Sequence, residues 1–177
     1  MKNIFLQSAN LIFEPLEEKH ISYNYVSWLN DPEITKFNSH GIFPNTLEKT
    51  KAYVNSISTS NSQIVLAIIE KESNLHIGNI SISSIDYINS NAEISIVIGE
   101  KSSWSKGYAT ESFNIIIEHI FNKLNIYKVT AGTTSDNIGM QKVFKKLNMS
   151  KEATLKNHIK RDNKYFDIYR YAKFNEK

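Results

Sequence analysis

Hydrophobic and polar residues alternate with a period of two around position 95 of the chain. Ile94, Ile96 and Ile98 fall on one face of such a segment, and Glu93 and Val97 fall on the other. This alternation predicts a half-buried β-strand, which ends where the chain reaches a glycine.

A second pattern begins about ten residues later, where apolar residues recur at helical spacing. Between the two patterns lies a loop of small and polar residues. The spacing predicts an amphipathic helix with one apolar stripe. The stripe consists of Ala109, Phe113, Ile116, Ile117, Ile120, Phe121 and Leu124.

The remaining patterns predict a change of organisation along the chain. Short β-rich runs joined by turns indicate an antiparallel meander in the middle, and strands alternate with helices after it. The predicted strands are residues 4–16, 63–70, 75–85, 92–99, 126–133 and 164–174. The predicted helices contain residues 21–29, 47–57, 109–124 and 138–147, with Thr46 and Asn137 as N-caps. We expect an α+β fold with a mixed, mostly antiparallel central sheet and helices on both faces.

Composition narrows the class of protein. The 177 residues fit one domain, residues 1–177, and 41% are hydrophobic. The formal net charge of +3 comes with scattered lysines, which suits an anionic ligand and does not indicate nucleic acid binding. Without cysteine the chain has no disulfide and no thiol nucleophile, in keeping with a cytoplasmic protein. No signal peptide and no membrane-spanning run is expected.

The loop before the second pattern opens onto the start of a helix. The first N–H groups of a helix lack partners within the helix, and the helix dipole adds positive potential there. Gly107 and Ala109 leave room for a close ligand, so Ser105–Thr110 could hold a phosphate group with backbone N–H donors. The alternative is an ordinary strand–loop–helix connection, because neither the dinucleotide fingerprint nor a P-loop is present.

Two motifs resemble those of the GNAT superfamily of N-acetyltransferases. Residues 104–109, Trp-Ser-Lys-Gly-Tyr-Ala, resemble its acyl-CoA loop Gln/Arg-x-x-Gly-x-Gly/Ala, except that Trp104 replaces the usual polar residue. Residues 137–149 resemble a second family motif, in which Asn137 and Lys146 match while Met140 departs. The order of the elements is similar to the RimJ/RimL branch of the family.

The resemblance implies acetyl-CoA as acyl donor, a sheet with two splayed strands at the acyl-CoA site, and direct transfer to a primary amine in a ternary complex. In the family the pantetheine arm pairs with a strand edge, so Val97 is the expected backbone donor to the thioester oxygen. No metal is expected. The implied cofactor-binding residues are Val97, Ile98, Gly99, Trp104, Ser105, Lys106, Gly107, Tyr108, Ala109, Thr110, Asn137 and Lys146.

Glu93 is the expected general base, because relatives carry a glutamate at about this place; its alternative is a solvated residue at a strand start. Many relatives use a tyrosine as general acid, but Phe144 stands at that position. Tyr108 is expected to be too distant from the leaving group. Water or a tyrosine of the last strand could protonate the thiolate instead.

Relatives cover the acceptor site with the first two helices and the loop between them. We therefore expect acceptor contacts from this part of the chain, although each residue could simply pack. The candidates are Tyr25, Trp28, Asn30, Phe37 and His40. A protein N-terminus and a nucleotide-linked amino sugar are equally open as acceptors, and polyamines rank lower.

The departures from the family motifs leave a second class of function open. The chain could be a non-catalytic acyl-CoA-binding or interaction module. A homodimer through the C-terminal strands is expected by analogy only.

Overall fold

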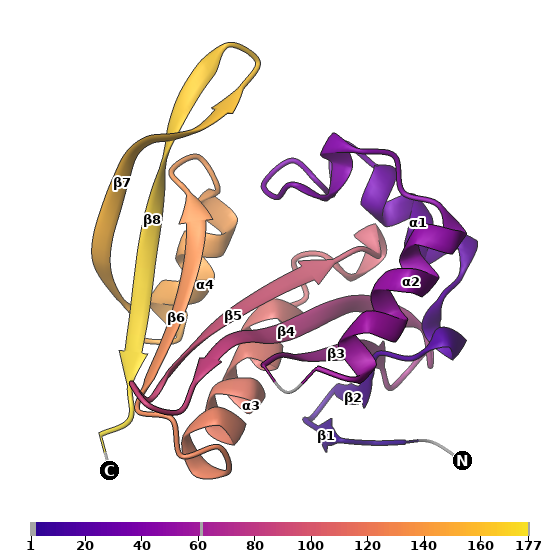
Figure 1. Ribbon diagram of the computed structural model, residues 1–177, viewed down its shortest axis with the longest axis horizontal. Helices are drawn as coiled ribbons and strands as arrows, with labels where there is room; N and C mark the ends of the chain where they lie inside the picture. Colours follow the sequence, from indigo (N-terminus) through magenta and orange to yellow (C-terminus); the bar gives the residue numbers. More distant parts are fainter. Residues whose placement is uncertain (1–2, 61, 177) are drawn as a thin grey trace.

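The computed structural model describes residues 3–60 and 62–176, and in this part of the chain all strands join one sheet (Figure 1). The strands are β1 Leu6–Gln7, β2 Leu11–Pro15, β3 Ile64–Glu70, β4 His76–Asp86, β5 Asn91–Ile98, β6 Lys128–Thr134, β7 Ser150–Arg161 and β8 Lys164–Phe174. The helices are α1 Tyr23–Asn30, α2 Leu47–Ser58, α3 Tyr108–Asn122 and α4 Ile138–Lys146, with short 3-10 turns η1 Glu18–His20, η2 His40–Ile42 and η3 Lys101–Ser103. The described helices include none that is long and apolar enough to cross a bilayer.

The sheet has the order β1-β2-β3-β4-β5-β6-β8-β7, and among the strands of the described residues only β5 and β6 are parallel neighbours. These two strands pair over three positions, from Asn91 opposite Lys128 to Glu93 opposite Thr130. Beyond this point they diverge, and Figure 1 shows the open angle between them. The predicted α+β sheet with two splayed strands is confirmed.

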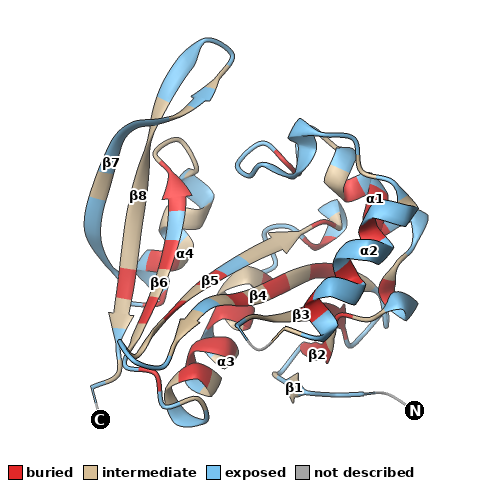
Figure 2. Cartoon of the chain, in the orientation of Figure 1, coloured by how far each residue is buried: buried red, intermediate tan, exposed pale blue. Residues whose placement is uncertain are grey.

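Two apolar clusters stabilise the two faces of the sheet. The larger packs α3 and α4 against the sheet through residues such as Phe13, Ile80 and Phe113. The smaller packs α1 and α2 on the opposite face, around Trp28 and Val54. Figure 2 shows the buried stripe of α3 facing the sheet, as its helical spacing predicts.

Local polar contacts define where several elements begin. The side chains of Thr46 and Asn137 accept hydrogen bonds from backbone N–H groups three residues later, so both predicted N-caps are confirmed. The predicted first strand, residues 4–16, is two strands instead, because a turn at residues 8–10 folds β1 back onto β2.

The long hairpin of β7 and β8 projects beyond the rest of the sheet (Figure 1). Its turn is made by Asp162 and Asn163, whose φ values of 45° and 60° match a left-handed two-residue hairpin. Strand β7 was not predicted, because its residues are mostly exposed and polar and show little alternation.

Candidate functional site

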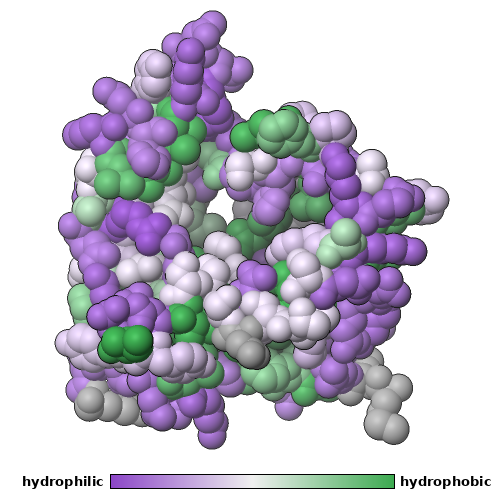
Figure 3. Space-filling view, in the orientation of Figure 1, coloured by the Kyte–Doolittle hydropathy of each residue, from purple (hydrophilic) through white to green (hydrophobic). Residues whose placement is uncertain are grey.

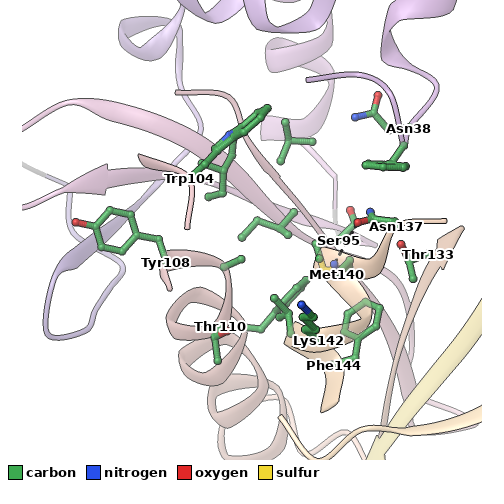
Figure 4. A pocket seen from close by; sticks show the side chains of 18 of the residues that line it. Asn38, Ser95, Trp104, Tyr108, Thr110, Thr133, Asn137, Met140, Lys142 and Phe144 are labelled. Carbon is green, nitrogen blue, oxygen red and sulfur yellow. Dashed lines mark hydrogen bonds between the residues drawn. The ribbon is translucent and has the colours of Figure 1, made fainter. Parts of the chain in front are cut away.

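A pocket of about 790 Å³ lies where β5 and β6 diverge. The splayed strands β5 and β6 form two walls of this pocket. A third wall is formed by residues 31–45, called the acceptor loop below. Figure 3 shows the molecule hollowed between its two halves, and Figure 4 shows Asn38 of the acceptor loop across from Thr133 and Asn137. The predicted cofactor-binding residues that line it are Val97, Ile98, Trp104, Ser105, Gly107, Tyr108, Ala109, Thr110, Asn137 and Lys146.

The register of β5 decides which of its backbone groups face this pocket. Gly99 donates its N–H to the Ile77 carbonyl at 2.9 Å, which fixes the phase of the ladder between β4 and β5. Residues of an antiparallel ladder point their backbone groups alternately toward and away from the neighbouring strand. Val97, opposite Asn79, therefore points its N–H toward β4. The residues with backbone groups directed toward β6 and the pocket are Ile94, Ile96 and Ile98.

This register corrects one sequence-based expectation. The N–H of Val97 belongs to the ladder and is not available to an acyl group. Ile96 and Ile98 flank Val97, and both have an N–H with no partner in β4 that faces the pocket. Ile96 is the one of the two that also lines the smaller pocket described below.

Trp104 occupies the end of the same strand edge. Its indole Nε1–H donates to the Ile98 carbonyl at 2.9 Å. This bond satisfies a carbonyl that no longer has a strand beside it, and it places the indole against the pocket (Figure 4). Trp104, which stands where the family motif has glutamine or arginine, thus has a structural role at the end of β5.

The pocket reaches the N-terminus of α3 at one end. Gly107 is the N-cap residue, with φ of +86°, a left-handed conformation that favours glycine. Ser105 also has a positive φ, of 63°. Because of this loop conformation, the first-turn N–H groups of α3, which lack partners within the helix, face the pocket. This arrangement suits an anion.

A buried carboxylate anchors this loop. Glu70, at the end of β3, accepts hydrogen bonds from Ser73, from the Tyr108 hydroxyl at 2.7 Å and from Lys106 at 3.2 Å. These three donors lower the pKa of Glu70 to about 2. The same carboxylate raises the pKa of the Tyr108 hydroxyl to about 12. Figure 4 shows that hydroxyl directed away from the rest of the pocket, so Tyr108 anchors the loop and is not placed as an acid.

We expect Glu70→Gln to destabilise the protein by about 2 kcal/mol at pH 7, because charged hydrogen bonds of a buried carboxylate are lost. The folded-state pKa of Glu70 lies below its unfolded value, so the stabilisation is complete above about pH 5 and disappears as the pH falls toward 2. Urea unfolding at pH values from 7 to 3 measures the free energy of unfolding of the wild type and the variant. Glu72→Gln removes an exposed carboxylate nearby and is the control. Equal stability of both variants at pH 7 would refute the anchor.

Helix α4 forms the other long wall of the pocket. Asn137 caps it by accepting the Met140 N–H at 3.1 Å. Lys142 and Lys146 are four residues apart and both line the pocket, as neighbours on one helix face do. Phe144 stands at the usual acid position; it is buried, and its phenyl ring has no ionisable proton to donate. The tyrosines of β8 do not line the pocket.

Glu93 does not line the pocket. Its carboxylate receives a hydrogen bond of 2.6 Å from Arg170, which extends from β8 across Gly132 of β6. Arg170 also donates to Thr130 at 3.3 Å. The pair therefore joins β5 to β8 at the point where β5 and β6 separate. Glu93 is placed to hold this point together, and this contact, together with its place outside the pocket lining, argues against the predicted role of Glu93 as a base.

A second, smaller pocket of about 70 Å³ lies on the α1 and α2 side of β5. Of the predicted acceptor residues, Tyr25, Trp28 and His40 line it, and Phe37 lines the larger pocket. Asn30 lines neither pocket. Its side chain exchanges hydrogen bonds with Asn45, so it fixes the two ends of the acceptor loop.

A clasp, made by Arg161 with Asp136 and Lys36, joins the β7–β8 hairpin to the acceptor loop. Arg161 donates two hydrogen bonds to Asp136, of 2.8 and 2.9 Å, and one of 2.9 Å to the Lys36 carbonyl. Its guanidinium also lies over the rings of Phe37 and Phe166. Lys36 lines the larger pocket from the acceptor loop, and Asn137, next to Asp136, lines it from the start of α4. The clasp therefore joins two walls of this pocket.

Comparison with known proteins defines the class. Residues 10–150 match the family described as Acetyltransferase (GNAT) domain. The chain belongs to this family of acyltransferases. It is 26% identical over 174 residues to the uncharacterized N-acetyltransferase p20 of Bacillus licheniformis, covering 97% of this chain and 96% of p20.

Solved structures of several acetyltransferases share the fold, and two of them are in complex with coenzyme A. One is RimL, a ribosomal L7/L12 alpha-N-protein acetyltransferase in complex with coenzyme A, with TM-score 0.86, 18% identity and 97% of each chain covered. The other is spermidine N-acetyltransferase from Vibrio cholerae in complex with CoA and spermine, with TM-score 0.85 and 18% identity, covering 94% of this chain and 96% of that one. At such identities the likeness concerns the fold alone.

Several residues of the site were missed from the sequence. Lys142 could have been found, since it lies four residues before Lys146 on the same helix face. The others are brought together only by the fold and carry no local signal. They are Asn38, Tyr53, Asn79 and Ser95.

Proposed function

We propose that this protein transfers an acetyl group from acetyl-CoA directly to a primary α-amine, such as a peptide N-terminus, in a ternary complex. The observation that carries the proposal is the meeting of two pockets at β5. The larger pocket reaches the N-terminus of α3, whose backbone donors suit an anion, and the smaller opens on the other side of the strand. A donor and an acceptor can so reach one strand from two sides.

The larger pocket suits acetyl-CoA by its chemistry. The first turn of α3 offers backbone donors for a pyrophosphate, and Lys142 and Lys146 add positive charge. The unpaired edge of β5 offers backbone groups to amides of the pantetheine arm. The N–H of Ile96 would face the thioester oxygen, whose developing charge such a donor stabilises.

The smaller pocket favours a short amine group. A volume of about 70 Å³ admits a few heavy atoms, less than a sugar ring requires. Its lining contains aromatic and neutral polar groups, such as Tyr53, Asn79 and Ser95, and no carboxylate. Among residues 3–60 and 62–176, Glu33 is the one carboxylate that lines the larger pocket, and it is paired with Lys101 at 2.7 Å. A polyamine has further ammonium groups that would lack partners here, so an α-amine is favoured over spermidine and over an amino sugar.

Thiol release from acetyl-CoA tests the proposal. The chain has no cysteine, so the protein itself does not react with the thiol reagent. The panel contains peptides with Ser, Ala, Met and Glu at the first position, amino sugars and their nucleotide conjugates, and spermidine. We expect a kcat/KM for the best peptide at least tenfold above that for spermidine, and acetylation of its α-amine by mass spectrometry.

Calorimetry with acetyl-CoA separates the alternatives. No binding by the folded protein would reject the donor assignment. Binding with no turnover on any acceptor would favour the non-catalytic acyl-CoA-binding module. Higher activity on spermidine than on every peptide would reject the acceptor class while leaving N-acetylation in place.

A further inference from the structure

The walls that the two pockets share identify where donor and acceptor would meet. They consist of three successive residues of β5 and one residue of the acceptor loop, namely Ser95, Ile96, Val97 and His40. Among these four, His40 alone has a side chain that can accept and release a proton near neutral pH.

The backbone around His40 is held firmly. Its N–H donates to the Asn38 side chain at 2.9 Å, and its carbonyl accepts from the Asn45 side chain at 2.9 Å. The next residue is Gly41, where a Cβ would lie 2.4 Å from Oγ1 of the packed Thr35, so the loop is tight at this point. The imidazole itself makes no hydrogen bond to the residues that the structure describes. The ring is thus positioned by its backbone and left free for a ligand.

We infer that His40 is the general base of the acetyl transfer and removes a proton from the ammonium group of the acceptor. The inference rests on the proposed function and assigns to His40 the role that Glu93, bound to Arg170, does not fill. The amine nitrogen forms the C–N bond to the acetyl carbon, and the C–S bond breaks. One ammonium proton goes to His40 and then to solvent, and a second goes to the leaving sulfur.

The pKa of an α-ammonium group is well suited to deprotonation by a histidine. An α-ammonium has a pKa near 8, whereas that of an alkyl ammonium is near 10.4. Proton transfer to an imidazole is therefore more favourable from a peptide N-terminus, by about two pKa units. This difference would add to the preference that the small, carboxylate-free pocket creates.

The surroundings of His40 support a neutral imidazole at pH 7. His40 is an exposed residue at the pocket rim, and the neighbouring groups remove part of the water around its ring; this partial loss of hydration lowers the pKa of His40. Burial raises the pKa of Tyr25 on α1 to about 12 and raises that of Tyr53 on α2, so both hydroxyls stay neutral. The charged groups that line the larger pocket are Glu33 and Lys36 on the same loop and Lys142 and Lys146 on α4.

His40→Ala, assayed with the best peptide acceptor, tests the inference. We expect kcat to fall by about 100-fold at pH 7, in the range general bases contribute. Added imidazole should restore activity in proportion to its free-base concentration. The dissociation constant of acetyl-CoA should change less than threefold. His158→Ala replaces an exposed histidine of β7 and should retain full activity.

A second readout does not depend on turnover. The protein has five histidines, and the imidazole NMR signal missing in His40→Ala identifies His40. This signal should titrate below pH 6.5. A pKa above 7, unchanged activity of His40→Ala, or a defect that imidazole does not relieve would each overturn the inference. If the wild type itself acetylates no amine, the proposed function fails, and the result is distinct from a failure of His40.

Discussion

Replacing Ile96 with proline is expected to lower kcat by about 100- to 1,000-fold. The phase of the β4–β5 ladder directs the Ile96 N–H away from β4 and into the larger pocket, where it would stabilise the negative charge on the thioester oxygen. Losing one such donor costs roughly 3 to 4 kcal/mol in other enzymes. Proline removes this N–H and no ladder hydrogen bond, and its ring is tolerated at such strand positions.

The matched control is Ile96→Ala, which loses the same apolar side chain and keeps the N–H. We expect this variant to retain kcat within about fivefold and to melt at a temperature close to that of the proline variant. Initial rates at saturating acetyl-CoA and thermal unfolding measure both effects. Equal kcat values for the two variants would reject Ile96 as the donor. Calorimetry with CoA checks that the proline ring has not simply blocked the pocket.

Gly107→Asp is expected to weaken acetyl-CoA binding by roughly 30- to 100-fold. A carboxylate at this N-cap would lie beside the N–H groups proposed to hold the pyrophosphate, and repulsion at about 5 Å costs on the order of 2 to 3 kcal/mol near a protein surface. A Cβ at Gly107 would meet no atom within 4 Å, and the backbone strain that a side chain meets at φ of +86° is shared by the Asp variant and its Asn control. Asp and Asn both tolerate the left-handed conformation required here.

Gly107→Asn is the neutral control of nearly the same shape. A negative charge at the N-terminus of α3 interacts favourably with the helix dipole, so the Asp variant should melt no lower than the Asn variant. Relative to the Asn variant, the Asp variant should therefore bind acetyl-CoA more weakly and melt at the same or a higher temperature. Equal dissociation constants for the two variants would place the pyrophosphate elsewhere.

The parts of this protein that are visible in the sequence are those governed by local rules. Alternation at Ile94 to Ile98 and helical spacing from Phe113 to Ile120 reflect burial on one face, and the structure confirms both. Thr46 and Asn137 were recognisable because an N-cap is a contact over three residues. The splayed strands followed from the family resemblance, and the fold bears it out.

What could not be predicted depends on contacts between distant residues. The register of the β4–β5 ladder, set by the bond between Gly99 and Ile77, turns the Val97 N–H toward β4 and those of Ile96 and Ile98 toward the pocket. The partner of Glu93, Arg170, lies 77 positions away, and no local pattern links them. Strand β7 is exposed, so it lacks the alternation that burial imposes on other strands.

The clasp at Arg161 has a consequence for folding. Its contact with the Lys36 carbonyl joins positions 125 residues apart, and closing so long a loop costs chain entropy before any contact is gained. Neither Arg161 nor Lys36 belongs to the two apolar clusters that stabilise the sheet. The clasp should therefore form last during folding and open first during native-state fluctuations, while both clusters stay intact. The enclosure of the larger pocket would then open while the sheet stays folded, and amide exchange next to the clasp, at Lys36 and Phe37, would be faster than in β3, β4 and α3.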